Sequence, residues 1–239
     1  MPQVKKCCTR KPGPLPDTET QIALKFMRTL LSVVGAALCL ITGAYPLVYL
    51  LAENDVGLLQ IRNDAVVSNF WWRLGFHAHI LTGGAALATG WSQFIRPWRI
   101  RFPKLHRAVG TFYALMVLVS GLAAVCISPM AFTGRIAALG FGTLGLLWLY
   151  FTLQACSSIR QRNLQRHGCM MVYSYSACCA AVTLRLWLPL LYGVFKLDFA
   201  LAYPIVAWLC WVPNLLIAGM INHRALQTQS TGPDDIHKP

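Results

Sequence analysis

Long runs of apolar residues alternate with short basic segments along this sequence. An α-helix rises about 1.5 Å per residue, so about 20 apolar residues cross the hydrocarbon core of a bilayer. Six stretches have that length, at 29–52, 70–94, 108–132, 136–158, 168–195 and 199–222. We therefore predict an all-α fold, a polytopic membrane helix bundle with six transmembrane helices in a lipid bilayer.

The composition supports this class. Of the 239 residues, 56% are hydrophobic and 12% are charged, whereas a soluble domain is about 25% charged. The net charge of +13 does not indicate a nucleic-acid partner, because the basic residues form short clusters between apolar runs. The acidic residues all lie outside the six stretches, at Asp17, Glu19, Glu53, Asp55, Asp64, Asp198, Asp234 and Asp235.

The two ends of the chain are polar, and we expect both to be disordered. Residues 1–28 form a basic tail, residues 29–222 form the six-helix transmembrane domain, and residues 223–239 form a second tail. No cleavable signal peptide is visible at the start, so the first span is expected to direct membrane insertion. Cys7 and Cys8 lie among basic residues, where both acylation and an unmodified tail fit the sequence.

Small residues recur at helical spacing in two of the spans. In the second span they form one stripe with two polar residues: His79, Gly83, Ala86, Gly90 and Gln93. The stripe in the fourth span consists of Gly134, Ala138, Gly142 and Gly145. Such stripes let helix backbones approach closely in a membrane, so we expect them to face other helices.

Arg185 lies well inside the fifth predicted span. An arginine there costs on the order of 3 kcal/mol and needs hydrogen-bond acceptors. It follows His167 by 18 residues, or roughly 27 Å of helix, and His79 precedes Gln93 by 14 residues, or roughly 21 Å. Arg185 and His79 are therefore expected in the outer half of the bundle. One interpretation is that Arg185 extends to outer headgroups or caps helix-end carbonyls. The other is that it receives an anionic or carbonyl group of a cofactor, lipid or substrate.

A second polar cluster is predicted at the opposite, basic level of the bundle, with Gln93, His106 and His167. Neutral imidazole is the usual axial ligand of haem iron, so one haem b between the two histidines is one interpretation. Hydrogen bonds to helix-end carbonyls or lipid phosphates are the other. Zinc is disfavoured, because no carboxylate or thiolate set accompanies the histidines.

Several of these residues carry a resemblance to a known family. In the second and third spans they are His79, Gly83, Ala86, Gly90, Gln93, Phe94, Pro103, Leu105, His106, Arg107, Gly110 and Tyr113. In the last two spans they are Arg166, His167, Met171, Ser174, Tyr175, Thr183, Leu184, Arg185, Leu186, Trp208, Trp211, Val212 and Asn214. Over about residues 70–215 the chain resembles the membrane-protein family catalogued as domain of unknown function 2306.

This resemblance implies a multi-pass helical fold and supplies no established activity. Met170 and Tyr173 stand where the family usually has Trp and Arg after the histidine. The pair His106 and His167 also gives a looser likeness to transmembrane cytochromes b, which bind haem between histidines on facing helices.

Three classes of function remain open. The one we favour is a redox protein that binds haem or a quinone, with His106 and His167 as ligands and Arg185 as anchor; haem absorbance near about 400 nm would reveal it. The second is a transporter or small-molecule binding protein, with Arg185 and His79 lining an outward cavity. The third is a structural or assembly factor without a cofactor. No hydrolase motif is present, and the sequence leaves enzymatic activity and oligomeric state open.

The distribution of basic residues predicts the orientation in the membrane. Sixteen Lys and Arg residues lie on one side of the predicted spans, and only Arg62, Arg73, Arg135 and Lys196 lie on the other. The positive-inside rule then places both termini in the cytoplasm. A reporter enzyme fused after Pro239 should report a cytoplasmic location, and an exoplasmic signal would overturn this topology.

Overall fold

The computed structural model describes residues 18–51, 66 and 68–230, and these residues form helices without a strand. The chain divides into two units, residues 1–37 and residues 38–239. The described part of the first unit belongs to α1 (Thr18–Ala44), and nearly all of its described side chains are exposed. The second unit holds the end of α1 and the remaining helices. The all-α fold predicted from the sequence is confirmed.

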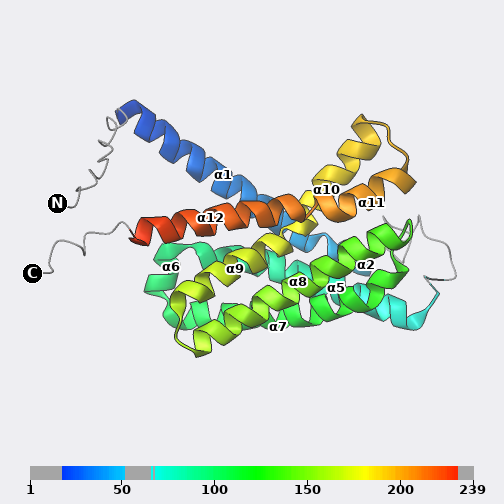
Figure 1. Cartoon of the computed structure of the whole chain (residues 1–239), viewed down its shortest axis with the longest axis horizontal. Helices are drawn as coiled ribbons and strands as arrows, with labels where there is room; N and C mark the ends of the chain where they lie inside the picture. Colours follow the sequence, from blue (N-terminus) through cyan, green and yellow to red (C-terminus); the bar gives the residue numbers. More distant parts are fainter. Residues whose placement is uncertain (1–17, 52–65, 67, 231–239) are drawn as a thin grey trace, which may run out of the picture. The chain divides into compact units, whose positions relative to one another are not determined.

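The described helices that follow α1 are a mixture of short and long elements. They are α2 (Pro46–Leu51), α5 (Phe70–Gly90), η1 (Trp91–Phe94), α6 (Arg96–Arg101), α7 (Pro103–Ile127), η2 (Ser128–Met130), α8 (Arg135–Arg160), α9 (Leu164–Cys178), α10 (Ala180–Pro189), η3 (Leu190–Val194), α11 (Phe199–Leu209) and α12 (Val212–Ser230). Helices α5, α7, α8 and α9 lie side by side in this order, and α11 and α12 pack against α8 and α9 (Figure 1).

Five segments among the described residues are long and apolar enough to cross a membrane: Glu19–Tyr49, Pro103–Met130, Arg135–Arg160, Leu164–Val194 and Phe199–Gln227. They correspond to five of the six predicted spans. The remaining one, 70–94, is α5 continued by η1. Its length of 21 residues is sufficient, but Arg73, His77 and His79 make it less apolar than the others.

The ends of the bundle differ from the sequence prediction. Helix α1 begins at Thr18, where we expected a disordered tail to residue 28, because Glu19 in the first turn favours a helix start and no Pro or Gly follows before Gly35. Helix α12 continues to Ser230, beyond the expected end at 222. The rest of the two predicted tails, with Cys7 and Cys8, lies outside the described residues.

Local sequence signals explain where several helices begin. The Asn69 side chain accepts a hydrogen bond from the Trp72 backbone N–H at 3.1 Å, and Asn163 accepts one from the Arg166 backbone N–H at 2.9 Å. Both are N-caps, which satisfy donors that the first turn leaves free. Gly134 precedes α8 with a φ of +90°, a conformation that favours glycine. It contacts no neighbour there, so its predicted place in the packing stripe of α8 is wrong.

The predicted stripe on α5 packs as expected. A Cβ atom at Gly83 would lie 2.8 Å from Ser120 Oγ on α7, and one at Gly90 would lie 2.5 Å from the Tyr175 ring on α9. Ala86 is completely buried. Because these positions admit no larger side chain, the two neighbours can approach the α5 backbone closely.

The last two predicted spans are each broken in the middle. Helix α9 ends at Cys178 and α10 begins at Ala180, while α11 ends at Leu209 and α12 begins at Val212. Polar groups join the two breaks: Thr183 Oγ1 donates a hydrogen bond to the Cys210 carbonyl, and Asn214 Nδ2 donates to the same carbonyl at 3.0 Å. Such partners are needed where an interrupted helix frees backbone groups inside a membrane.

Replacing Gly83 with Leu should destabilise the bundle. The added side chain would force α5 away from Ser120, and overpacking of this kind typically costs about 1–3 kcal/mol. Thermal unfolding of the purified protein in detergent measures the effect. Gly35→Leu is the matched control, because a Cβ atom at Gly35 has no neighbour within 4 Å. Equal melting temperatures for Gly83→Leu and Gly35→Leu would contradict the close contact between α5 and α7.

Candidate binding site at the breaks of two helices

A cavity of about 170 Å³ lies among the helices of the second unit. Both helix breaks contribute to its wall, through Cys178 and Ala180 on one side and Cys210 on the other. Two basic side chains, His79 and Arg185, and the hydroxyl-bearing Thr42 also line it. Its apolar walls are formed by Ile80, Leu87, Ala124, Phe141, Leu144, Trp148 and Leu184.

Arg185 reaches this cavity from α10. Its Nη1 atom donates a hydrogen bond to the Ala181 carbonyl at 2.9 Å, and its Cζ atom lies 4.8 Å from the centroid of the Tyr45 ring. Its two partners are thus a backbone carbonyl and an aromatic face. Among the described residues no carboxylate pairs with Arg185. A guanidinium carries five N–H donors, so donors remain for a molecule in the cavity.

His79 is held in place by Ser120 on α7. Its Nδ1 atom lies 3.1 Å from the Ser120 carbonyl oxygen and 3.0 Å from Ser120 Oγ, and Ser120 Oγ donates to the His79 carbonyl at 2.9 Å. A carbonyl only accepts, so we assign the ring proton to Nδ1. The other ring nitrogen is then an acceptor available to a ligand. The structure thus brings Arg185 and His79, which the sequence placed at one depth, to one cavity.

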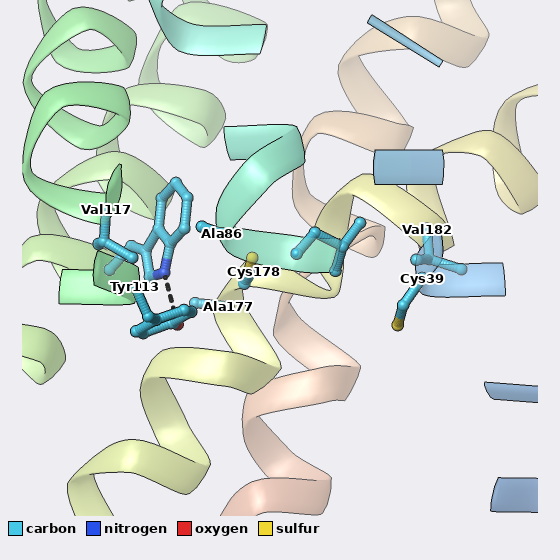
Figure 2. Packing of buried hydrophobic residues seen from close by; sticks show 9 residues of the cluster. Cys39, Ala86, Tyr113, Val117, Ala177, Cys178 and Val182 are labelled. Atoms are coloured by element: carbon cyan, nitrogen blue, oxygen red, sulfur yellow. Dashed lines mark hydrogen bonds between the residues drawn. The ribbon is translucent and has the colours of Figure 1, made fainter. Parts of the chain in front are cut away.

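A buried hydrogen-bond network fixes the position of Trp148, which lines the cavity. Ser174 Oγ lies 2.8 Å from the Tyr113 hydroxyl and 2.7 Å from Thr152 Oγ1. Trp148 Nε1 donates to the Tyr113 hydroxyl at 3.4 Å, as the dashed line in Figure 2 marks. Figure 2 also shows Tyr113 beside Ala177 and Cys178 in the same core cluster. Ser174 and Tyr113 are among the residues that carry the family resemblance, whereas nothing in the sequence singled out Trp148 or Thr152.

The second predicted cluster is only partly brought together. A cavity of about 50 Å³ is lined by Gln93 and His106, as expected, but His167 does not line it. The Nδ1 atom of His167 instead bonds to the Ala155 carbonyl at 2.9 Å. His167 still lies within electrostatic range of His106. The alternative that the histidines bond to carbonyls is therefore realised for His167.

The two histidines as placed do not fit a haem. Pockets for molecules of drug size occupy about 300–1,000 Å³, whereas the cavity beside His106 measures about 50 Å³. Among residues 18–51 and 68–230, no group of three or more His, Cys, Asp or Glu side chains is arranged to hold a metal ion. The seven cysteines described are free thiols, and three of them, Cys39, Cys178 and Cys210, are buried in the core.

These helices and the cavity among them define a polytopic helical membrane protein. The chain belongs to the family described as "Predicted membrane protein (DUF2306)", whose family model matches residues 76–222. The match includes His79, Gln93, His106, His167 and Arg185, so it confirms the resemblance drawn from the sequence. No curated protein and no solved structure matches the chain. The looser likeness to transmembrane cytochromes b gains no support from these comparisons.

Proposed function

We propose that this protein binds a small amphipathic molecule in the cavity lined by Arg185 and His79, as a binding protein or transporter. One observation carries the proposal: the guanidinium of Arg185 lines an apolar cavity and has no carboxylate partner among the described residues. Of the ligands that the sequence suggested, a quinone is retained in this proposal.

The chemistry of the cavity defines the class of ligand. A buried arginine that retains unused donors is best satisfied by a carboxylate or by carbonyl oxygens, which accept planar N–H donors. The remaining walls are apolar, so the body of the ligand should be apolar as well. An engineered protein cavity of about 150 Å³ binds benzene. The cavity here therefore suits a ring or a short chain with an acceptor at one end, such as a quinone head or a medium-chain carboxylate.

The two helix breaks support a ligand-binding role over a purely structural one. Many membrane transporters build their substrate sites from discontinuous helices near the middle of the bilayer. Here Cys178 and Ala180 at one break and Cys210 at the other line the same cavity. Two interrupted spans that meet at one cavity are an arrangement suited to holding a ligand between them.

Arg185→Lys tests the proposal. The purified protein is titrated with octanoate and, separately, with a short-chain ubiquinone, and binding is followed by calorimetry and by thermal stabilisation in detergent. At least one probe should bind the parent protein. Arg185→Lys keeps the charge but loses the planar fork of donors, so affinity should fall about tenfold, equivalent to about 1.4 kcal/mol.

Arg135→Lys is the matched control, because Arg135 is exposed at the start of α8. This variant should bind the probes like the parent protein. Full tolerance of Arg185→Lys would favour a structural role for this arginine. An equal loss in both variants would show that the effect does not arise at the cavity and would contradict the proposal. Absence of binding by the parent to either probe would exclude carboxylates and quinones as ligands.

A further inference from the structure

The short helix α6 has the composition of a segment at a membrane surface. It carries Arg96, Arg99 and Arg101, and the apolar side chains of Trp98 and Ile100 are exposed beside them. Tryptophan and arginine are enriched where the hydrocarbon of a bilayer meets its headgroups. Helix α6 connects η1 to α7, so it lies at one end of the bundle. We infer that this end contacts the headgroup layer.

The cavity of about 50 Å³ opens beside α6 and has two kinds of wall. Its polar residues are Ser92, Gln93, Arg99 and His106, and Gln93 is 9% exposed. Its apolar residues include Trp98, Phe102 and Leu105, which are 50%, 48% and 52% exposed. A polar pocket with a half-exposed apolar rim is suited to a ligand with a polar head and a tail that runs along the protein surface.

The polar wall is positively charged and lacks a counter-ion. Arg99 lies within electrostatic range of His106, and no hydrogen bond or carboxylate from the described residues engages either side chain. The neighbouring cations differ, because Arg107 Nε donates to the Pro103 carbonyl at 3.3 Å and Arg166 Nη2 donates to Gln154 Oε1 at 3.0 Å. The sequence contains no Asp or Glu from residue 65 to residue 197. An anion from outside the chain is thus the natural partner of Arg99 and His106.

We propose that this cavity binds the phosphate group of an anionic membrane phospholipid. Arg99, His106 and the Gln93 amide supply donors to phosphate oxygens, as basic pockets between membrane helices do for lipid headgroups. The cavity volume admits a phosphate group but not a nucleotide or a sugar phosphate. The apolar rim of Trp98, Phe102 and Leu105 accommodates the beginning of the acyl chains. A free phosphate ion would leave that rim without a role.

Binding of short-chain phosphatidic acid tests this site, because its headgroup is a phosphate alone. The purified full chain in neutral detergent is titrated with this lipid, with phosphatidylcholine of the same chain length and with inorganic phosphate, and binding is measured by native mass spectrometry and thermal stabilisation. We expect phosphatidic acid to bind more tightly than either of the others. Arg99→Gln should weaken its binding about fivefold, since one basic residue near an anionic lipid contributes about 1 kcal/mol.

Arg101→Gln is the matched control on the same helix. Its guanidinium carbon lies 5.6 Å from the centroid of the Phe102 ring, and Arg101 does not line the cavity, so its loss should weaken binding less than twofold. His106→Gln should weaken binding as Arg99→Gln does. Melting temperatures without lipid identify any variant that fails to fold. Equal losses for Arg99→Gln and Arg101→Gln, or inorganic phosphate binding as tightly as the lipid, would overturn the proposal.

Discussion

The hydroxyl group of Ser174 connects three helices inside the buried core. It meets the Tyr113 hydroxyl from α7 and Thr152 Oγ1 from α8, and Tyr113 and Ser174 are both fully buried. In hydrocarbon every polar group must be satisfied internally, and no buried side-chain nitrogen or oxygen among the described residues lacks a partner. Because Trp148 bonds to the same Tyr113 hydroxyl, this network also fixes one wall of the cavity.

The sequence predicted the parts of the fold that depend on local periodicity. The spacing of Gly83 and Gly90 identified the face of α5 that packs, and the helical rise placed Arg185 and His79, which line one cavity, in the same half of the bundle. It did not predict the break at Cys178, because no Pro or Gly marks that position. The break after Leu209 is followed by Pro213, and within a helix proline is tolerated only in the first turn. The residues that line one cavity are set by the rotation of each helix relative to its neighbours. The periodicity of a single helix does not determine that rotation.

The separation of charges along the chain explains why both candidate sites have the same character. All acidic residues lie outside the predicted spans, so a cation within the bundle has only neutral acceptors in the spans themselves. Arg185 uses a carbonyl and an aromatic ring. Such contacts satisfy hydrogen-bond donors but supply no carboxylate to compensate the charge of the guanidinium. Both proposed ligands are therefore acceptors from outside the chain, with a shape set by the surrounding apolar side chains.

The polar character of α5 has a consequence for biosynthesis. Its His77 ring bonds within the helix, to the Arg73 carbonyl at 2.8 Å, but His79 depends on Ser120 of α7. Alone in lipid, α5 would therefore carry the His79 imidazole without its hydrogen-bond partner. Its apolar residues would offset this cost less than those of the other spans would. The hairpin of α5 and α7 is the smallest piece of this region that supplies His79 with its partner. The His79 ring therefore gains this partner only after Ser120 of α7 has been synthesised.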